Sequence, residues 1–164
     1  MPGSPESVGR EEIRLTRVLI GAGNDFAGDD GAGCLVARSL RPRLPEVNVV
    51  ESSGDGMALL DCWTADDDVI LVDAAVTGAP PGTIHTFDAV AGPLPESLRL
   101  ASSHAFGVAQ GIELARALGR LPRRLTIQAI EGVGFDTAAD VTPAVARAIE
   151  RVAAAVIEEW RVPQ

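Results

Sequence analysis

The chain carries a short apolar run, Val18 to Ile20, that leads directly into a glycine-rich turn and then into two adjacent aspartates. The apolar run predicts a central β-strand, and Gly21 and Gly23 allow the backbone to turn sharply at its carboxyl end. A helix is expected after the turn, because a stripe of apolar residues follows at Cys34, Leu35, Ala37 and Leu40. This order is typical of an open α/β sheet, which binds its ligands at the carboxyl ends of the strands.

The two aspartates, Asp29 and Asp30, stand where this helix should begin. One carboxylate can cap the helix, and Asp29 is the expected cap. Asp30 then faces the crevice as a ligand, although a capping role for Asp30 is equally open. A dinucleotide site is disfavoured, because Phe26 replaces the third glycine of its fingerprint and two carboxylates would repel a pyrophosphate. The chain has no lysine, which excludes a P-loop.

Strands and helices alternate along the sequence, which predicts a parallel sheet. The fold class is therefore α/β, as a single three-layer domain with a mostly parallel twisted sheet flanked by helices. A flexible N-terminal tail is expected over residues 1–14 and a single α/β peptidase domain over residues 15–164. The predicted strands are 18–20, 47–51, 69–73, 83–87 and 125–130, of which 83–87 lies at an edge. The predicted helices are 31–40, 57–64 and 104–118, the last of these capped by Ser102 or Ser103. A final helix is expected with Thr142 as N-cap and Pro143 at its first position.

The charge balance of the chain excludes several classes of partner. It has 23 acidic and 14 basic side chains, a net charge of -9, which disfavours nucleic acid and anionic membrane surfaces. No apolar segment is long enough for membrane insertion. Cys34 and Cys62 show no CxxC spacing, so neither a zinc site nor a disulfide framework is predicted. A cytoplasmic location is expected.

Three polar side chains are expected at one rim of the sheet: Asp30 after the first strand, Asp73 at the end of the strand 69–73, and His104 at the start of the helix 104–118. Two carboxylates and one imidazole form a ligand set that suits a divalent transition metal. A helix N-terminus would favour the neutral imidazole that a metal requires. Each residue also has a structural alternative, such as a cap or a turn contact. His85, inside the edge strand, is expected to be structural or solvent-facing.

Other catalytic arrangements are ranked lower. The chain has neither a G-x-S-x-G elbow nor an H-E-x-x-H motif. Ser102 and Ser103 are adjacent to His104 in sequence only, which does not indicate a nucleophile. Cys34 and Cys62 both have the character of small core residues.

Four short motifs in this order and structural context resemble the hydrogenase maturation endopeptidases. They are Gly21-Ala-Gly-Asn24 through Asp29-Asp30-Gly31-Ala-Gly33, then Gly54-Asp55-Gly56-Met57, then Leu71-Val-Asp73-Ala, and then Ser102-Ser-His104-Ala-Phe-Gly107. The resemblance extends to Ile130-Glu131-Gly132 and to Val141-Thr142-Pro143-Ala144. One departure is Glu51, which stands where some relatives have an aspartate.

The resemblance implies an endopeptidase that removes the C-terminal extension of the precursor of a [NiFe] hydrogenase large subunit. In that family the enzyme recognises nickel that the substrate already carries, so nickel is supplied by the substrate and is not permanently bound. The metal-contacting and catalytic positions carry over to Asp30, Asp73 and His104. One alternative is a non-proteolytic docking or chaperone protein for the nickel site. Another is a small-molecule hydrolase or ligand-binding domain that acts without nickel.

Two mechanisms are compatible with the resemblance. In a metal-assisted endopeptidase, the nickel held by Asp30, Asp73 and His104 polarises the scissile carbonyl or activates a water. In an aspartyl-type mechanism, the nickel only identifies the substrate, and Asp30 or Asp73 acts as general base.

Overall fold

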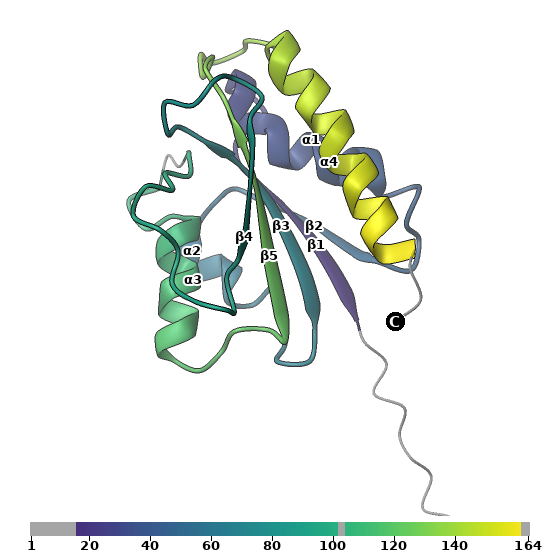
Figure 1. Cartoon of the computed structure of the whole chain (residues 1–164), viewed down its shortest axis with the longest axis vertical. Coiled ribbons are helices and arrows are strands. Elements are labelled where there is room, and N and C mark those ends of the chain that lie inside the picture. Colours follow the sequence, from purple (N-terminus) through teal and green to yellow (C-terminus); the bar gives the residue numbers. More distant parts are fainter. Residues whose placement is uncertain (1–15, 102–103, 162–164) are drawn as a thin grey trace, which may run out of the picture.

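The computed structural model describes residues 16–101 and 104–161 (Figure 1). Five strands form one sheet in the order β2-β1-β3-β5-β4, in which only β4 is antiparallel to its neighbour. The predicted fold class is confirmed, whereas the predicted tail 1–14 lies outside the described residues. The strands are β1 (Arg17–Ala22), β2 (Asn48–Ser52), β3 (Asp68–Ala75), β4 (Ile84–Asp88) and β5 (Arg124–Glu131), and the helices are the 3-10 helix η1 (Gly28–Gly31), α1 (Ala32–Leu40), α2 (Gly56–Leu59), α3 (Val108–Ala117) and α4 (Pro143–Arg161).

Helices cover both faces of the sheet, α1 and α4 on one face and α2 and α3 on the other (Figure 1). Successive side chains of a strand point to opposite faces, so Val18 and Ile20 pack toward α2 and α3 while Leu19 packs toward α1 and α4. Burial on both faces explains why the central strands are continuous apolar runs. Each fully buried aliphatic side chain stabilises the fold by roughly 1.5–3 kcal/mol relative to an exposed one.

The chain reverses its direction across the sheet at β1. From β1 it passes through α1 to β2 on one side, and then through α2 to β3 on the other side of β1. Where the connections diverge in this way, open α/β sheets bind ligands in a crevice outside the carboxyl ends of the strands, which here are the ends of β1 and β3. Asp30 follows β1 and Asp73 lies in β3, so the topology brings both to this crevice.

The start of α3 differs from the prediction. The helix begins at Val108 with Gly107 as N-cap, and the Gly107 amide donates to Oε1 of Gln110 at 3.1 Å. A tertiary contact sets this start: a Cβ on Gly56 would lie 2.2 Å from the Gly107 carbonyl oxygen. His104 therefore precedes the helix, and the prediction that it stands at a helix N-terminus is wrong. The predicted caps Ser102 and Ser103 lie outside the described residues.

One further boundary differs from the prediction, and the others follow it closely. The helix α2 ends at Leu59, five residues earlier than expected, because the chain leaves the helix in a series of tight turns such as the one from Leu59 to Cys62. The prediction of β4 as an edge strand is confirmed. The helix α4 begins at Pro143 as predicted and buries its apolar stripe, which consists of Val145, Ile149, Val152, Val156 and Trp160. Of the helices described, none has the length and apolarity to cross a bilayer.

Candidate active site

Asp30 lies in η1, and its side chain contacts the turn that follows β1. The Asn24 amide donates to its Oδ2 at 3.2 Å. Its other oxygen, Oδ1, is buried and has no hydrogen-bond partner among the described residues. Burial raises the pKa of Asp30, and the Asn24 hydrogen bond and the nearby His104 only partly offset the rise. The turn requires Gly23, which has φ +132° and lies so close that a Cβ would meet the Asp30 carbonyl oxygen at 2.0 Å.

The second carboxylate, Asp73, is almost fully enclosed in β3, with 1% of the residue exposed. The pairing of β3 with β1 ends at Val72, whereas its pairing with β5 continues through Asp73 to Ala75. Asp73 therefore lies inside the strand and not at its end, where the sequence placed it. Its Oδ1 accepts the Ala74 amide at 2.8 Å, and its Oδ2 is buried without a partner in the described part of the chain.

The charge of Asp30 adds to the energetic cost of ionising the buried Asp73 carboxylate. Burial raises the pKa of Asp73 well above its ordinary value, the Ala74 amide opposes the rise, and the Asp30 charge adds to it. Three buried side-chain polar atoms lack a partner in residues 16–101 and 104–161, and two of them are Asp30 Oδ1 and Asp73 Oδ2. A buried polar atom without a partner costs free energy, so both oxygens would be stabilised by a cation or a donor brought to this edge.

His104 is the third of the predicted metal-contacting residues, and it lies at the surface of the protein. The residue is exposed and lies in the segment between Ala101 and α3. Its charge influences the pKa of Asp30, and its Cδ2 would lie 3.9 Å from a Cβ on Gly54. Within the described ranges, no three His, Cys, Asp or Glu side chains gather closely enough to hold a metal ion. Among the described residues, Asp30, Asp73 and His104 thus share one edge of the sheet without forming a cluster of metal ligands.

The role predicted for Asp29 is wrong, because its carboxylate caps neither η1 nor α1. Its Oδ2 accepts the amides of Val133 and Gly134 at 2.9 Å each, and its Oδ1 accepts the Thr142 amide at 2.7 Å. The Thr142 hydroxyl donates to the same carboxylate. Burial alone would raise the pKa of Asp29, but these hydrogen bonds outweigh burial and lower it. Asp29 therefore fastens the turn that carries Asp30 to the loop between β5 and α4.

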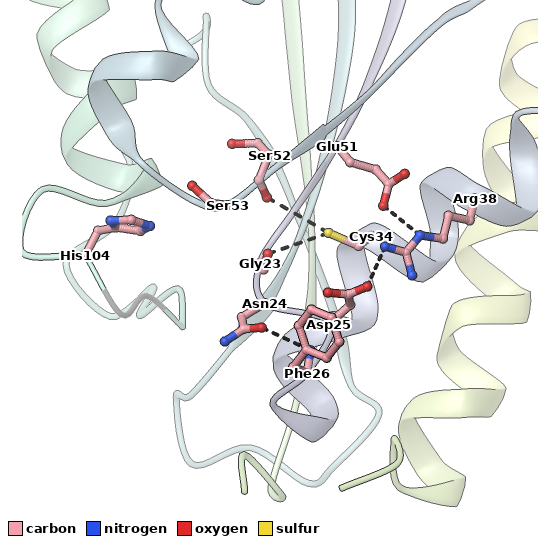
Figure 2. A pocket seen from close by; sticks show the side chains of 10 residues that line it. All are labelled: Gly23, Asn24, Asp25, Phe26, Cys34, Arg38, Glu51, Ser52, Ser53 and His104. Carbon is pink, nitrogen blue, oxygen red and sulfur yellow. Dashed lines mark hydrogen bonds and ion pairs between the residues drawn. The ribbon is translucent and has the colours of Figure 1, made fainter. Parts of the chain in front are cut away.

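A pocket of about 430 Å³ opens beside this turn (Figure 2). Figure 2 shows His104 on one side of the pocket and Arg38 on the other, with Cys34 between them. Arg38 forms ion pairs with Glu51, at 2.7 Å, and with Asp25. Burial raises the pKa of the Cys34 thiol to about 11, so the thiol stays protonated and donates weakly to backbone carbonyls.

Asp25 and Arg38 line this pocket although no sequence pattern marked them as site residues, and Glu51 stood out in the sequence only as a departure from the family. One signal was available for Arg38, because it follows Cys34 by four residues and so shares a helix face with it. The expectation that Cys34 is a small buried residue is confirmed. It also lines the pocket.

The other histidine, His85, contacts a buried carboxylate. Its Nε2 lies 3.2 Å from Oε2 of Glu131 at the end of β5. Glu131 also accepts the amides of Thr77 and Gly78, at 2.8 and 2.9 Å. These contacts tie the loop after β3 to β5 and support the structural role expected for His85.

Comparisons with known proteins agree with this architecture. A family model described as "HycI: Hydrogenase maturation protease" matches residues 34–159. The hydrogenase 2 maturation protease of Escherichia coli (strain K12) is 28% identical over 137 residues, covering 81% of this chain and 83% of that protein. The hydrogenase expression/formation protein HoxM of Cupriavidus necator is 26% identical over 151 residues, covering 87% and 74%. The solved structure of the hydrogenase maturating endopeptidase HybD from E. coli superposes with a TM-score of 0.72 at 22% identity, covering 90% of this chain and 93% of that one, and supports the fold.

Proposed function

This chain belongs to the hydrogenase maturation protease family, and we propose that it removes the C-terminal extension of a [NiFe] hydrogenase large-subunit precursor that already carries nickel. One observation in the structure carries the proposal. Asp30 and Asp73 each hold a buried carboxylate oxygen without a partner among the described residues, at the crevice between β1 and β3. Such oxygens are suited to a cation that arrives with the substrate.

In this proposal, Asp30, Asp73 and His104 contact the nickel of the precursor. A cation in the crevice would favour the ionised carboxylates, and it would therefore lower the two pKa values that burial raises. The imidazole adds a nitrogen donor, and imidazole suits nickel. The exposed position of His104 leaves it accessible to a large protein substrate. The two cysteines are free, which suits the cytoplasm that we assign to this reaction.

The same three residues serve two mechanisms that differ in what the nickel does. It can polarise the scissile carbonyl or activate a water while the three side chains hold it. Alternatively, the nickel only identifies a precursor that is ready for cleavage, and Asp30 or Asp73 acts as general base toward the attacking water. The two mechanisms differ in which step fails when a ligand is replaced, so binding and cleavage have to be measured separately.

The test uses the purified full chain with one large-subunit precursor in two forms, nickel-loaded and nickel-free. The intact mass of the large subunit reports cleavage, and calorimetry reports binding. We expect the wild type to remove the extension from the nickel-loaded form alone. Asp30→Asn should leave the extension in place, while Asp136→Asn, which changes an exposed aspartate of the β5–α4 loop, should cleave like the wild type.

Each contrary result has a distinct meaning. Removal of the extension from both forms would refute recognition of nickel. Nickel-dependent binding without any cleavage by the wild type would refute the endopeptidase and favour a docking protein. If Asp30→Asn binds the nickel-loaded precursor fully and does not cut it, Asp30 acts in the chemical step and not in recognition alone.

A further inference from the structure

Large apolar side chains are exposed mainly at one edge of the sheet. In residues 16–101 and 104–161, seven of them are exposed. One follows each of the four parallel strands: Phe26 comes after β1, Met57 after β2, Val76 after β3 and Val133 after β5. A fifth, Phe106, lies just before α3. These five side chains, here called the apolar rim, lie at the edge of the sheet that carries the candidate active site.

Part of the rim is fixed to the turn that carries Asp30. The Ala138 amide of the β5–α4 loop donates to the Phe26 carbonyl at 2.6 Å, and the Val133 amide donates to Asp29 at 2.9 Å. Phe26 lies in the turn itself, and Val133 is bonded to it. These bonds use main-chain atoms of the two rim residues, whose side chains stay outside, with Phe26 73% and Val133 62% exposed. The backbone is therefore held while the apolar groups face outward.

The other part of the rim lies near His104. The Gly56 amide donates to the Phe106 carbonyl at 2.9 Å, and a Cβ on Gly56 would lie 2.7 Å from Cδ1 of the Phe106 ring. Met57 follows Gly56 directly and is 55% exposed. His104 lines one pocket together with Phe26, which connects the two parts of the rim (Figure 2).

The two remaining exposed apolar side chains lie at the opposite edge of the sheet. Val90 follows the antiparallel strand β4, whose last residue, Asp88, pairs with Thr126 near the start of β5. Leu118 directly follows α3, from which the chain leads to the start of β5. Single scattered apolar side chains are ordinary on a protein surface, whereas several at one edge mark a surface that a partner covers.

The carboxylates at this edge select the kind of partner. Asp30 and Asp73 each have a buried carboxylate oxygen without a partner among the described residues. A partner that covers the rim excludes water, and a dehydrated carboxylate is costly unless the partner brings a cation or a hydrogen-bond donor. The complementary surface is therefore apolar and surrounds a cation, and the net charge of -9 repels polyanions such as nucleic acid. A folded protein that carries a metal ion meets these requirements.

We propose that the apolar rim docks the folded body of the precursor around its nickel site, so that the enzyme recognises the surface of the large subunit in addition to the ion. The inference rests on the proposed function and adds the surface that contacts the precursor. Contacts of this kind are the same in the bound substrate and in the transition state, so they act on KM and not on kcat.

The exposed apolar side chains outside the rim provide matched controls. Phe26→Ser, Met57→Ser and Val133→Ser each remove one side chain from the rim, whereas Leu118→Ser and Val90→Ser each remove one from the opposite edge. We expect Phe26→Ser to raise the KM for cleavage of the nickel-loaded precursor by about 5- to 30-fold, the loss typical of an aromatic interface hot spot. The other two rim variants should raise KM by smaller factors, and both controls should keep the wild-type KM.

A competitor separates the folded body of the precursor from its extension. The excised extension, as a synthetic peptide, is added during cleavage of the nickel-loaded precursor. If the rim contacts the folded body, the peptide should inhibit the wild type and Phe26→Ser with the same inhibition constant, or inhibit neither. A constant that rises in Phe26→Ser by the same factor as KM would assign the rim to the extension and overturn the inference.

A second copy of this chain is the alternative occupant of the rim. Sedimentation of the enzyme without substrate tests it, and we expect the wild type and Phe26→Ser to sediment alike. A wild-type dimer that Phe26→Ser converts to a monomer would assign the rim to self-association and overturn the inference. Thermal unfolding checks that each variant is folded, and Phe26→Ala, Met57→Ala and Val133→Ala replace any rim variant that is not.

Two kinetic results would overturn the inference while cleavage by the wild type keeps the proposed function. One is an unchanged KM in all three rim variants. The other is a loss that lies in kcat, which would place the rim side chains in the chemical step. A wild type that leaves the nickel-loaded precursor uncut would refute the proposed function, and this inference with it.

Discussion

Two neighbouring aspartates, Asp29 and Asp30, occupy the same short helix and are both buried, yet their surroundings are opposite. Both oxygens of Asp29 accept hydrogen bonds from the loop between β5 and α4, and these bonds lower its pKa despite burial. Asp30 has one accepted hydrogen bond and one buried oxygen without a partner in the described residues, and burial raises its pKa.

The difference separates a structural carboxylate from one that is available to a ligand. The interactions of Asp29 are complete within the fold, so its contribution is to stability. Those of Asp30 and Asp73 are incomplete, so the folded protein bears a cost that a bound cation or donor would relieve. Burial alone does not distinguish the two classes, whereas the count of satisfied oxygens does.

The largest expected effect is on cleavage, and it tests the comparison directly. Asp30→Asn and Asp73→Asn should each lower the rate of precursor cleavage by about 10²–10⁴-fold, the scale of a lost general base, because both contact the nickel in the proposal and one of them is the base in the second mechanism. Asp29→Asn should lower it only in proportion to the fraction of protein that is unfolded. The intact mass of the large subunit over time, measured at a temperature where all three variants are folded, gives the rates.

A cleavage defect in folded Asp29→Asn as large as that of Asp30→Asn would contradict the distinction between a structural Asp29 and a ligand-binding Asp30. Asp29 would then belong to the reacting site despite its complete set of hydrogen bonds. The exposed control Asp136→Asn should retain the wild-type rate.

The second effect is on stability, and here Asp29 dominates. Asp29→Asn removes an acceptor from a buried set of charge-assisted hydrogen bonds and should lower the free energy of unfolding by about 2–4 kcal/mol. In a domain of this size the midpoint of thermal unfolding should fall by about 5–15 °C. Calorimetry of Asp29→Asn against Asp136→Asn checks this.

The stability difference between the wild type and Asp29→Asn should depend on pH, because the pKa of Asp29 is lowered in the folded state. The stabilisation is complete above the ordinary value of 3.8 and is lost as the pH falls through the lower pKa of the folded state. The gap between the wild type and Asp29→Asn should therefore stay constant from neutral pH down to 3.8 and close only below it. A gap that closes already near neutral pH would contradict the assignment.

The third prediction is a gain in the free energy of unfolding, opposite in sign to the loss expected for Asp29→Asn. Because the pKa of Asp73 is raised in the folded state, the unfolded chain releases this proton first, and stability falls as the pH rises above 3.8 toward the folded pKa. Asp73→Asn removes that loss and should raise the free energy of unfolding near neutral pH by about 1–2 kcal/mol. Urea unfolding at several pH values should show a gain that grows with pH across this window. A lower free energy of unfolding for Asp73→Asn than for the wild type at neutral pH would contradict this prediction.

The sequence predicts the parts of this molecule that local patterns determine. The apolar runs at 18–20 and 69–72 identify the central strands because both of their faces are buried, and strand order brings Asp30 and Asp73 to the same end of the sheet. The start of α3 depends on the contact of Gly56 with Gly107, which no local pattern indicates. The partners of Asp29 lie more than a hundred residues away, so its residue type suggested a cap instead.

The smallest effect concerns a third aspartate of the same turn, Asp25, which is paired with the half-exposed guanidinium of Arg38. Arg38→Ala breaks this ion pair and the one with Glu51, but water screens both. The free energy of unfolding should fall by less than about 1 kcal/mol. The loss should shrink further at high salt, since screening weakens exposed pairs. Chemical denaturation at low and high salt measures both values. A salt-independent loss as large as that of Asp29→Asn would show that Asp25 shares the structural role of Asp29, because only a buried, fully bonded carboxylate is insensitive to screening.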